Sequence, residues 1–135
     1  MTRPRVVVAD DLPSVLATAA ALLREPFDVV DMVTDGRAAV EATLALKPDL
    51  VVLDISMPEM SGIEAAIELK KRGSPAKIVF LTVHQDIDIL QACQAAGGLG
   101  YVVKLSMDED LITAMREALA GHMFTSKFRS PQNIP

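Results

Sequence analysis

Five short apolar runs separated by helical patterns constrain the fold of this 135-residue chain more than any other feature. The runs are rich in β-branched residues and lie at residues 5–9, 28–32, 50–53, 77–81 and 100–103. They are short and largely continuous in hydrophobicity, as expected for strands that are covered on both faces. Strands that alternate with helices are typical of βαβ units around a parallel sheet. We therefore predict an α/β fold with a doubly wound, five-stranded parallel sheet and right-handed crossovers.

Helix start and stop signals fill the intervals between and after these runs. The expected helices span about 13–23, 35–47, 61–73, 86–96 and 106–121. Asp35 can cap the second of these helices through its carboxylate. Ser61 with Glu64, and Ser106 with Glu109, each match the S-x-x-E capping box that begins a helix. The sequence therefore predicts five helices, one after each strand.

Length, charge and cysteine content restrict the classes of protein that this chain can be. It has the size of one domain, and no apolar segment approaches the ~20 residues of a membrane span. The net charge of −5 argues against a surface that grips nucleic acid. The single cysteine, Cys93, is expected to be a small buried hydrophobe, and His84 and His122 are expected in exposed loops. We expect a soluble cytoplasmic protein, with one domain in residues 1–122 and a tail or the start of a linker in residues 123–135.

Side chains that can carry chemistry follow the ends of four of the five predicted strands. Asp10 and Asp11 follow the first strand, Asp54 the third, Thr82 the fourth and Lys104 the fifth. The carboxyl ends of parallel strands lie on one edge of the sheet, where ligands bind in open α/β folds. These side chains are therefore predicted to face a common crevice.

Three carboxylates in one crevice repel one another. Two unit charges about 4 Å apart at an effective dielectric of ~20 cost about 4 kcal/mol. Lys104 supplies one positive charge, and a cluster of oxygen ligands is also what Mg²⁺ prefers. A divalent ion beside a carboxylate, a lysine and a hydroxyl has the parts for phosphoryl transfer. Asp54 is the candidate nucleophile, and Asp10 and Asp11 are the candidates for holding the metal.

From residue 6 to about residue 124 the chain resembles the receiver domains of two-component response regulators. The resemblance is carried by Asp10-Asp11, by LDISMPEMSG with Asp54, by Thr82 and by GYVVK with Lys104. It implies a flavodoxin-like receiver fold with the sheet order 2-1-3-4-5. It also implies that a partner histidine kinase donates a phosphoryl group to Asp54, with Mg²⁺ as the cofactor. No enzyme activity is implied beyond the domain's own phosphotransfer and dephosphorylation.

The resemblance also assigns roles to individual residues. The backbone carbonyl of Ser56, two residues after the acceptor, would be a further metal ligand. Thr82 and Lys104 would stabilise the phosphoryl group. Thr82 would move toward that group, and Tyr101 would fill the space behind it. This switch would reshape the face formed by the fourth helix, the fifth strand and the fifth helix.

Two positions depart from the usual pattern of the family. Val83 stands where family members usually carry a small residue, and we expect it to narrow the approach to Asp54 and to slow phosphoryl exchange. Leu105 stands where many receivers have proline. With the helical ending AMREALAGHMF, the chain is most similar to the receivers of NarL/FixJ/LuxR-type transcription factors. DNA would then be bound only through an output domain absent from these residues, and phosphorylation would favour a homodimer.

Other interpretations of the same residues stay open at the level of sequence. Taken singly, Asp10 or Asp11 can cap a helix, Thr82 is an ordinary strand residue and Tyr101 an ordinary core aromatic. A phosphatase of the haloacid dehalogenase type is disfavoured because it needs a second aspartate at the position of Ser56. A flavin-binding module is disfavoured because the acidic first loop would repel its phosphate. The remaining alternatives are a stand-alone receiver and an interaction module that signals without phosphorylation.

Overall fold

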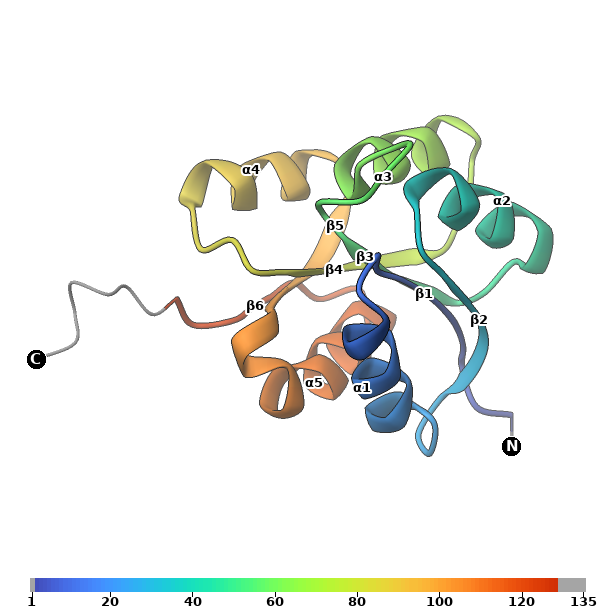
Figure 1. The fold of residues 1–135 in the computed structure, drawn as a ribbon, viewed down its shortest axis with the longest axis horizontal. Helices are drawn as coiled ribbons and strands as arrows, with labels where there is room; N and C mark the ends of the chain where they lie inside the picture. Colours follow the sequence, from blue (N-terminus) through green and yellow to red (C-terminus); the bar gives the residue numbers. More distant parts are fainter. Residues whose placement is uncertain (1, 129–135) are drawn as a thin grey trace, which may run out of the picture.

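The computed structural model describes residues 2–128 as a parallel β-sheet between two layers of helices (Figure 1). The strands are β1 (Arg5–Ala9), β2 (Asp28–Val33), β3 (Leu50–Asp54), β4 (Lys77–Thr82), β5 (Gly98–Val103) and β6 (Phe124–Thr125). The helices are α1 (Pro13–Leu23), α2 (Gly36–Leu46), α3 (Gly62–Lys71), α4 (Ile87–Ala95) and α5 (Met107–Leu119), with a 3₁₀ turn, η1 (Lys104–Ser106), before α5. Helices α1 and α5 cover one face of the sheet, and α2, α3 and α4 cover the other.

All neighbouring strands are parallel and follow the order β2-β1-β3-β4-β5-β6. This arrangement confirms the predicted α/β fold and the order 2-1-3-4-5, and it adds a sixth strand that the sequence does not predict. In β6, Phe124 pairs with Gly100 and Thr125 pairs with Tyr101. A strand of two residues has too few positions to show the alternation by which strands are recognised in a sequence.

The segment predicted as a tail or linker, 123–135, therefore contains a short strand of the sheet at Phe124–Thr125. Ser126, directly after β6, is buried and bonds to the backbone of β5. The part of this prediction that concerns residues 129–135 lies outside the described residues. Among the described helices, none combines the length and the apolar character that a membrane span requires.

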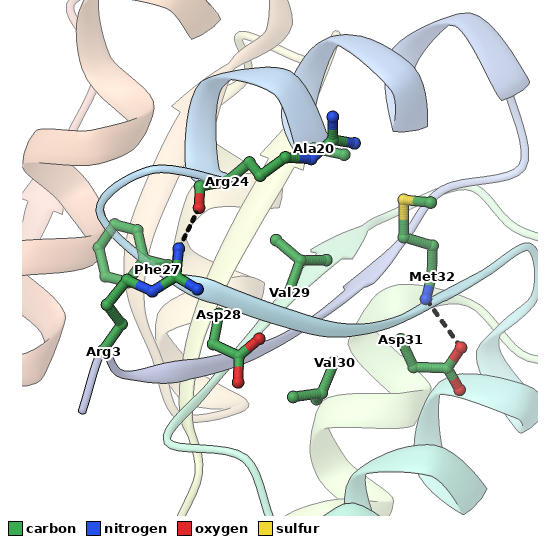
Figure 2. Close-up of a pocket in the computed structure, with 9 residues that line it drawn as sticks. All are labelled: Arg3, Ala20, Arg24, Phe27, Asp28, Val29, Val30, Asp31 and Met32. Carbon is green, nitrogen blue, oxygen red and sulfur yellow. Dashed lines mark hydrogen bonds between the residues drawn. The ribbon is translucent and has the colours of Figure 1, made fainter.

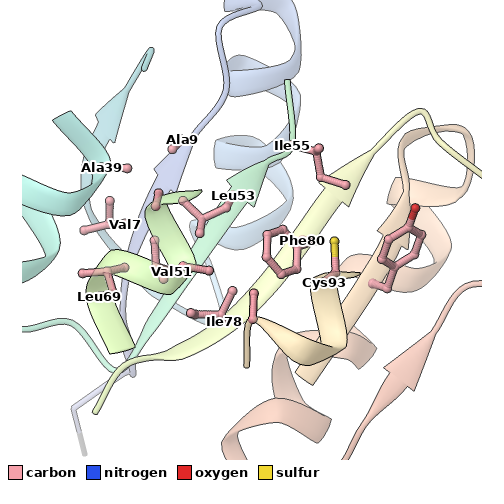
Figure 3. Close-up of a cluster of buried hydrophobic side chains, with 14 of the residues drawn as sticks. Val7, Ala9, Ala39, Val51, Leu53, Ile55, Leu69, Ile78, Phe80 and Cys93 are labelled. Carbon is pink, nitrogen blue, oxygen red and sulfur yellow. The ribbon is translucent and has the colours of Figure 1, made fainter. Parts of the chain in front are cut away.

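Alternation along each strand divides the buried side chains into two cores. In β1, Val7 and Ala9 contribute to the core beneath α2, α3 and α4, whereas Val6 and Val8 contribute to the core beneath α1 and α5. Figure 3 shows the first of these cores, where Cys93 from α4 lies among the strand side chains. Cys93 is thus a buried hydrophobe, as predicted. Because both faces are covered, the strand ends are the part of the sheet where polar groups reach the surface.

Helix starts follow the sequence signals in two of three cases. Asp35 accepts a hydrogen bond from the Ala38 backbone N–H and caps α2, as predicted. Ser61 and Glu64 form the predicted reciprocal capping box at α3. The capping box predicted at Ser106 is wrong, because η1 runs directly into α5 and Ser106 does not adopt an extended backbone. Three acidic side chains in the first turn of α5 instead stabilise its positive end.

Two glycines hold the loop between β3 and α3 against the rest of the fold. A Cβ atom on Gly62 would lie 2.0 Å from the carbonyl oxygen of Asp54, and one on Gly36 would lie 1.9 Å from that of Met60. The Gly62 N–H donates to the carbonyl of Ile55, and the Gly36 N–H donates to that of Pro58. Only residues without a side chain allow α2 and α3 to approach this loop so closely. The backbone of Asp54 is therefore fixed from its carbonyl side by the start of α3.

Candidate phosphoryl-transfer site

Three carboxylates meet where β1 and β3 end at the same edge of the sheet. Oxygen atoms of Asp10, Asp11 and Asp54 all lie within 4.8 Å of one another. Asp10 and Asp54 are buried, with 0% and 4% of their surfaces exposed, whereas Asp11 is exposed. The neighbouring strands β1 and β3 bring these acids together, as the sequence predicts.

Lys104 reaches this cluster from the end of β5. Its Nζ atom lies 2.8 Å from Asp10 Oδ2 and 3.5 Å from Asp54 Oδ1, and only 12% of its side chain is exposed. A lysine so well covered contributes more attraction than an ion pair in open solvent. One positive charge nevertheless faces three negative ones, so the cluster keeps an excess of negative charge.

The excess charge changes the acidity of Asp54. The pKa of Asp54 is raised from 3.8 to about 6, mainly by burial and secondly by the charge of Asp10. Lys104 and the backbone N–H of Ser56, which donates to Asp54 Oδ1 at 3.4 Å, act in the opposite direction. The effects of burial and of the Asp10 charge outweigh those of Lys104 and the Ser56 N–H. Asp54 is therefore held in an environment that favours a further positive charge or a proton.

The donor set of this cluster fits a hard divalent cation. Asp10 Oδ2 is fully buried and, among the described residues, receives no hydrogen bond in addition to its ion pair with Lys104. Carboxylate oxygens in such a cluster are the ligands that Mg²⁺ prefers. Asp10, Asp11 and Asp54 can thus hold a metal ion together. The carbonyl of Ser56 as a further ligand stays a prediction.

The predicted switch residues are connected through the backbone of one residue, His84. The His84 N–H donates to Thr82 Oγ1 at 3.0 Å, and the Tyr101 hydroxyl donates to the His84 carbonyl at 2.8 Å. Thr82 and Tyr101 are both buried. Burial raises the pKa of Tyr101 to about 12, so its hydroxyl remains a hydrogen-bond donor across the physiological range. A displacement of Thr82 therefore has a direct path to Tyr101 through the β4–α4 loop.

The role of His84 is not evident from the amino-acid sequence. His84 is half-buried, not simply exposed, and its ring lies 3.5 Å from the hydroxyl of Ser56. Its important contacts use backbone atoms, which every residue type possesses, so no side-chain signal could have identified it. His122 is exposed, as predicted, and contacts Glu117.

Two large apolar side chains stand exposed beside the site. Val83 directly follows Thr82 and is 65% exposed, and Leu105 directly follows Lys104 and is 70% exposed. Their exposure places hydrophobic surface next to the charged cluster.

The pocket shown in Figure 2 lies elsewhere, along the exposed edge strand β2. It has a volume of about 370 Å³ and is lined by Arg3, Ala20, Arg24, Phe27, Asp28, Val29, Val30, Asp31 and Met32. An Arg3 nitrogen donates to the backbone carbonyl of Arg24 within it. None of the residues of the acidic cluster lines this pocket. The candidate site and this pocket are therefore separate features of the structure.

Comparison with known proteins agrees with this geometry. A family model described as the response regulator receiver domain matches residues 6–116. The chain is 38% identical over 118 residues to the transcriptional regulatory protein PdtaR of Mycobacterium tuberculosis, a match that covers 86% of this chain and 57% of PdtaR. The chain thus spans less than two thirds of the length of this curated relative.

Two solved structures share the fold closely. A LuxR-family two-component response regulator from Aurantimonas sp. SI85-9A1 has a TM-score of 0.85 and 30% identity, over 97% of this chain and 92% of that one. The isolated receiver domain of RcsB from Salmonella enterica serovar Typhimurium was solved with the phosphomimetic BeF3-. It has a TM-score of 0.84 and 27% identity, over 93% of this chain and 95% of that one.

Proposed function

The chain belongs to the family of response regulator receiver domains, and from this premise we propose that it is a phosphorylation-dependent signalling receiver with Asp54 as its phosphoacceptor. The observation that carries the proposal is the meeting of three carboxylates with Lys104 at one end of the sheet. Asp10 and Asp54 are both buried, but only Asp54 has its backbone carbonyl against Gly62 at the start of α3. Mg²⁺ is the proposed cofactor, and Asp10, Asp11 and Asp54 would hold it.

Each residue of the site has a distinct part in the proposed transfer. A carboxylate oxygen of Asp54 attacks the phosphorus of a phosphohistidine, so that a P–O bond forms while the P–N bond breaks and its electron pair returns to the imidazole. Lys104 balances negative charge on the phosphoryl oxygens. Bound Mg²⁺ would supply further neutralisation of that charge. Thr82 accepts a hydrogen bond from the His84 N–H, and its own hydroxyl proton, which interacts with Tyr101, would turn to a phosphoryl oxygen.

The partner in this proposal is a histidine kinase, and the chain promotes only its own phosphorylation and dephosphorylation. Movement of Thr82 toward the phosphoryl group would change its hydrogen bond with the His84 N–H. The hydrogen bond between the His84 carbonyl and the Tyr101 hydroxyl would change with it. This change would alter the face formed by α4, β5 and α5, and we propose homodimerisation either through α4 and α5 or through α4 and β5. Control of transcription, which the name of the transcriptional regulatory protein PdtaR indicates for that protein, would require an output domain outside these 135 residues.

Intact-mass spectrometry with a small phosphoramidate donor and Mg²⁺ tests the proposal. We expect the wild-type chain to gain the mass of one phosphoryl group and the Asp54→Asn variant to gain none. The alternative, an interaction module that signals without phosphorylation, predicts no gain for either protein under conditions where a control receiver reacts. Sedimentation with and without beryllofluoride plus Mg²⁺ tests the dimer, and an unchanged monomer would contradict that part of the proposal.

A further inference from the structure

The segment 124–128, which we call the strap, lies along the outer edge of β5. Its strand β6 pairs in parallel with Gly100 and Tyr101, at the end of the sheet (Figure 1). An edge strand presents unpaired backbone groups that must be bonded by water or by another segment. The strap therefore completes the β5 edge with residues that the receiver pattern does not require.

Ser126 fastens the strap at three points. Its backbone N–H donates to the Tyr101 carbonyl at 2.8 Å, and its hydroxyl accepts from the Val103 N–H at 3.1 Å. The same hydroxyl donates to Asp110 Oδ2 at 2.7 Å, in the first turn of α5. Only 3% of Ser126 is exposed, so these bonds are shielded from water. The strap is thus joined both to the strand that carries Tyr101 and to the helix that follows it.

Phe128 joins the strap to the Tyr101 side chain itself. The two rings have centroids 5.8 Å apart and planes inclined by 52°, which is a favourable aromatic geometry. Tyr101 is 2% exposed, and its hydroxyl is bonded to the His84 carbonyl. The ring is therefore held at its hydroxyl by the β4–α4 loop and contacted by the strap. A rotation of Tyr101 away from this position would lose the contact with Phe128.

We propose that docking of the strap is coupled to the buried position of Tyr101, so that the segment 124–128 responds to the state of the Asp54 site. Such a coupling is reciprocal: whatever favours the buried Tyr101 favours the docked strap, and a docked strap favours the buried Tyr101. The direction in which phosphorylation acts rests on the proposed function, since it assumes that Thr82 moves and that Tyr101 occupies the space behind it. In that case phosphorylation tightens the strap.

The chain carries one tyrosine and no tryptophan, so its tyrosine fluorescence reports on Tyr101 alone. Acrylamide should quench the Tyr101 fluorescence more strongly in Phe128→Ala and in Ser126→Ala than in the wild-type chain. Each substitution removes a contact that holds the strap against β5 or Tyr101, so acrylamide reaches the ring more easily. Met123→Ala is the matched control, since Met123 precedes the strap and is 56% exposed. Quenching that stays at the wild-type level in Phe128→Ala and Ser126→Ala would overturn the proposal.

Hydrogen exchange tests the coupling in the opposite direction. Removal of the Tyr101 ring in Tyr101→Ala should speed exchange of the amides in residues 124–128 by about fivefold or more, the size of an ordinary coupling between sites. Tyr101→Phe keeps the ring and loses only the bond to His84, so it should have a smaller effect and provides a second variant that retains the core. Unchanged exchange of the strap in both variants would contradict the coupling.

Beryllofluoride with Mg²⁺ then separates this inference from the proposed function. We expect it to slow exchange of residues 124–128 in the wild-type chain and to leave the strap of Asp54→Asn unchanged. Beryllofluoride that binds, by fluorine NMR, without slowing the strap would overturn the inference and leave the proposed function standing. A failure of beryllofluoride to bind would count against the proposed function, and the coupling would then be decided by the Tyr101 and Phe128 variants.

Discussion

Replacement of Asp54 by asparagine should stabilise the fold at neutral pH, although it removes an ion pair with Lys104. The reason is that burial and the charge of Asp10 raise the pKa of Asp54 to about 6, against 3.8 for the ordinary group. Between these two values the folded chain binds more protons than the unfolded chain, so stability falls as the pH rises through this interval. Asparagine carries no charge and avoids this loss.

The size of the effect follows from the same two values. Each pKa unit corresponds to about 1.36 kcal/mol, so the charged Asp54 destabilises the fold by about 3 kcal/mol above pH 7. For a chain of this length, that free energy corresponds to about 10 °C in melting temperature. We expect Asp54→Asn to exceed the wild-type chain by roughly this amount at pH 7, and the difference should shrink by about 2 kcal/mol as the pH is lowered to 4.

Thermal unfolding monitored by circular dichroism, in steps of pH and without divalent ions, measures this difference. Asp28→Asn is the control, because Asp28 is an exposed carboxylate on β2 outside the cluster. Addition of Mg²⁺ at 100 times its Kd should raise the wild-type stability by about 2.7 kcal/mol and reduce the advantage of Asp54→Asn. If Asp54→Asn proved less stable than the wild-type chain at pH 7, attraction to Lys104 would have to outweigh the repulsion and the cost of burial.

Three further substitutions test other parts of the structure. Gly62→Ala places a Cβ atom against the Asp54 carbonyl and should destabilise the fold by about 1–3 kcal/mol in denaturant titrations; an unchanged midpoint would show that the loop can move aside. Ser61→Ala removes the capping box of α3 and should cost about 1 kcal/mol in the same assay, whereas a loss below the error of the titration would mean that the cap is dispensable. Val83→Ala removes exposed apolar bulk beside the site and should speed both phosphorylation and hydrolysis, measured by time-resolved mass spectrometry; unchanged rates would contradict a role for Val83 in access.

The architecture was predictable because the strands repeat one signal five times. Their shared hydrophobicity indicates a parallel sheet, and a parallel sheet brings its carboxyl ends to one edge, so the location of Asp11, Asp54 and Lys104 on the same edge follows without further information. The sheet order 2-1-3-4-5 depended on the resemblance to a family and was confirmed by the strand pairing.

The features that escaped prediction depend on backbone contacts between segments distant in the sequence. The link from Thr82 to Tyr101 passes through the N–H and carbonyl of His84, and β6 consists of two residues that become a strand only by pairing with β5. The capping-box pattern at Ser106 failed for a related reason, because a 3₁₀ turn brings the chain into α5 without an extended residue. Local propensity describes what a segment can do, and tertiary contacts decide among these possibilities.

The most direct measurement is the location of the phosphoryl group by peptide mapping after treatment with a phosphoramidate donor. With Mg²⁺ present, the modification should fall on the peptide that contains Asp54, and it should be strongly reduced by a chelator or by Asp11→Asn. A modification on any other residue, or one that forms equally well without a divalent ion, would contradict a site in which Asp10, Asp11, Asp54 and Lys104 act together.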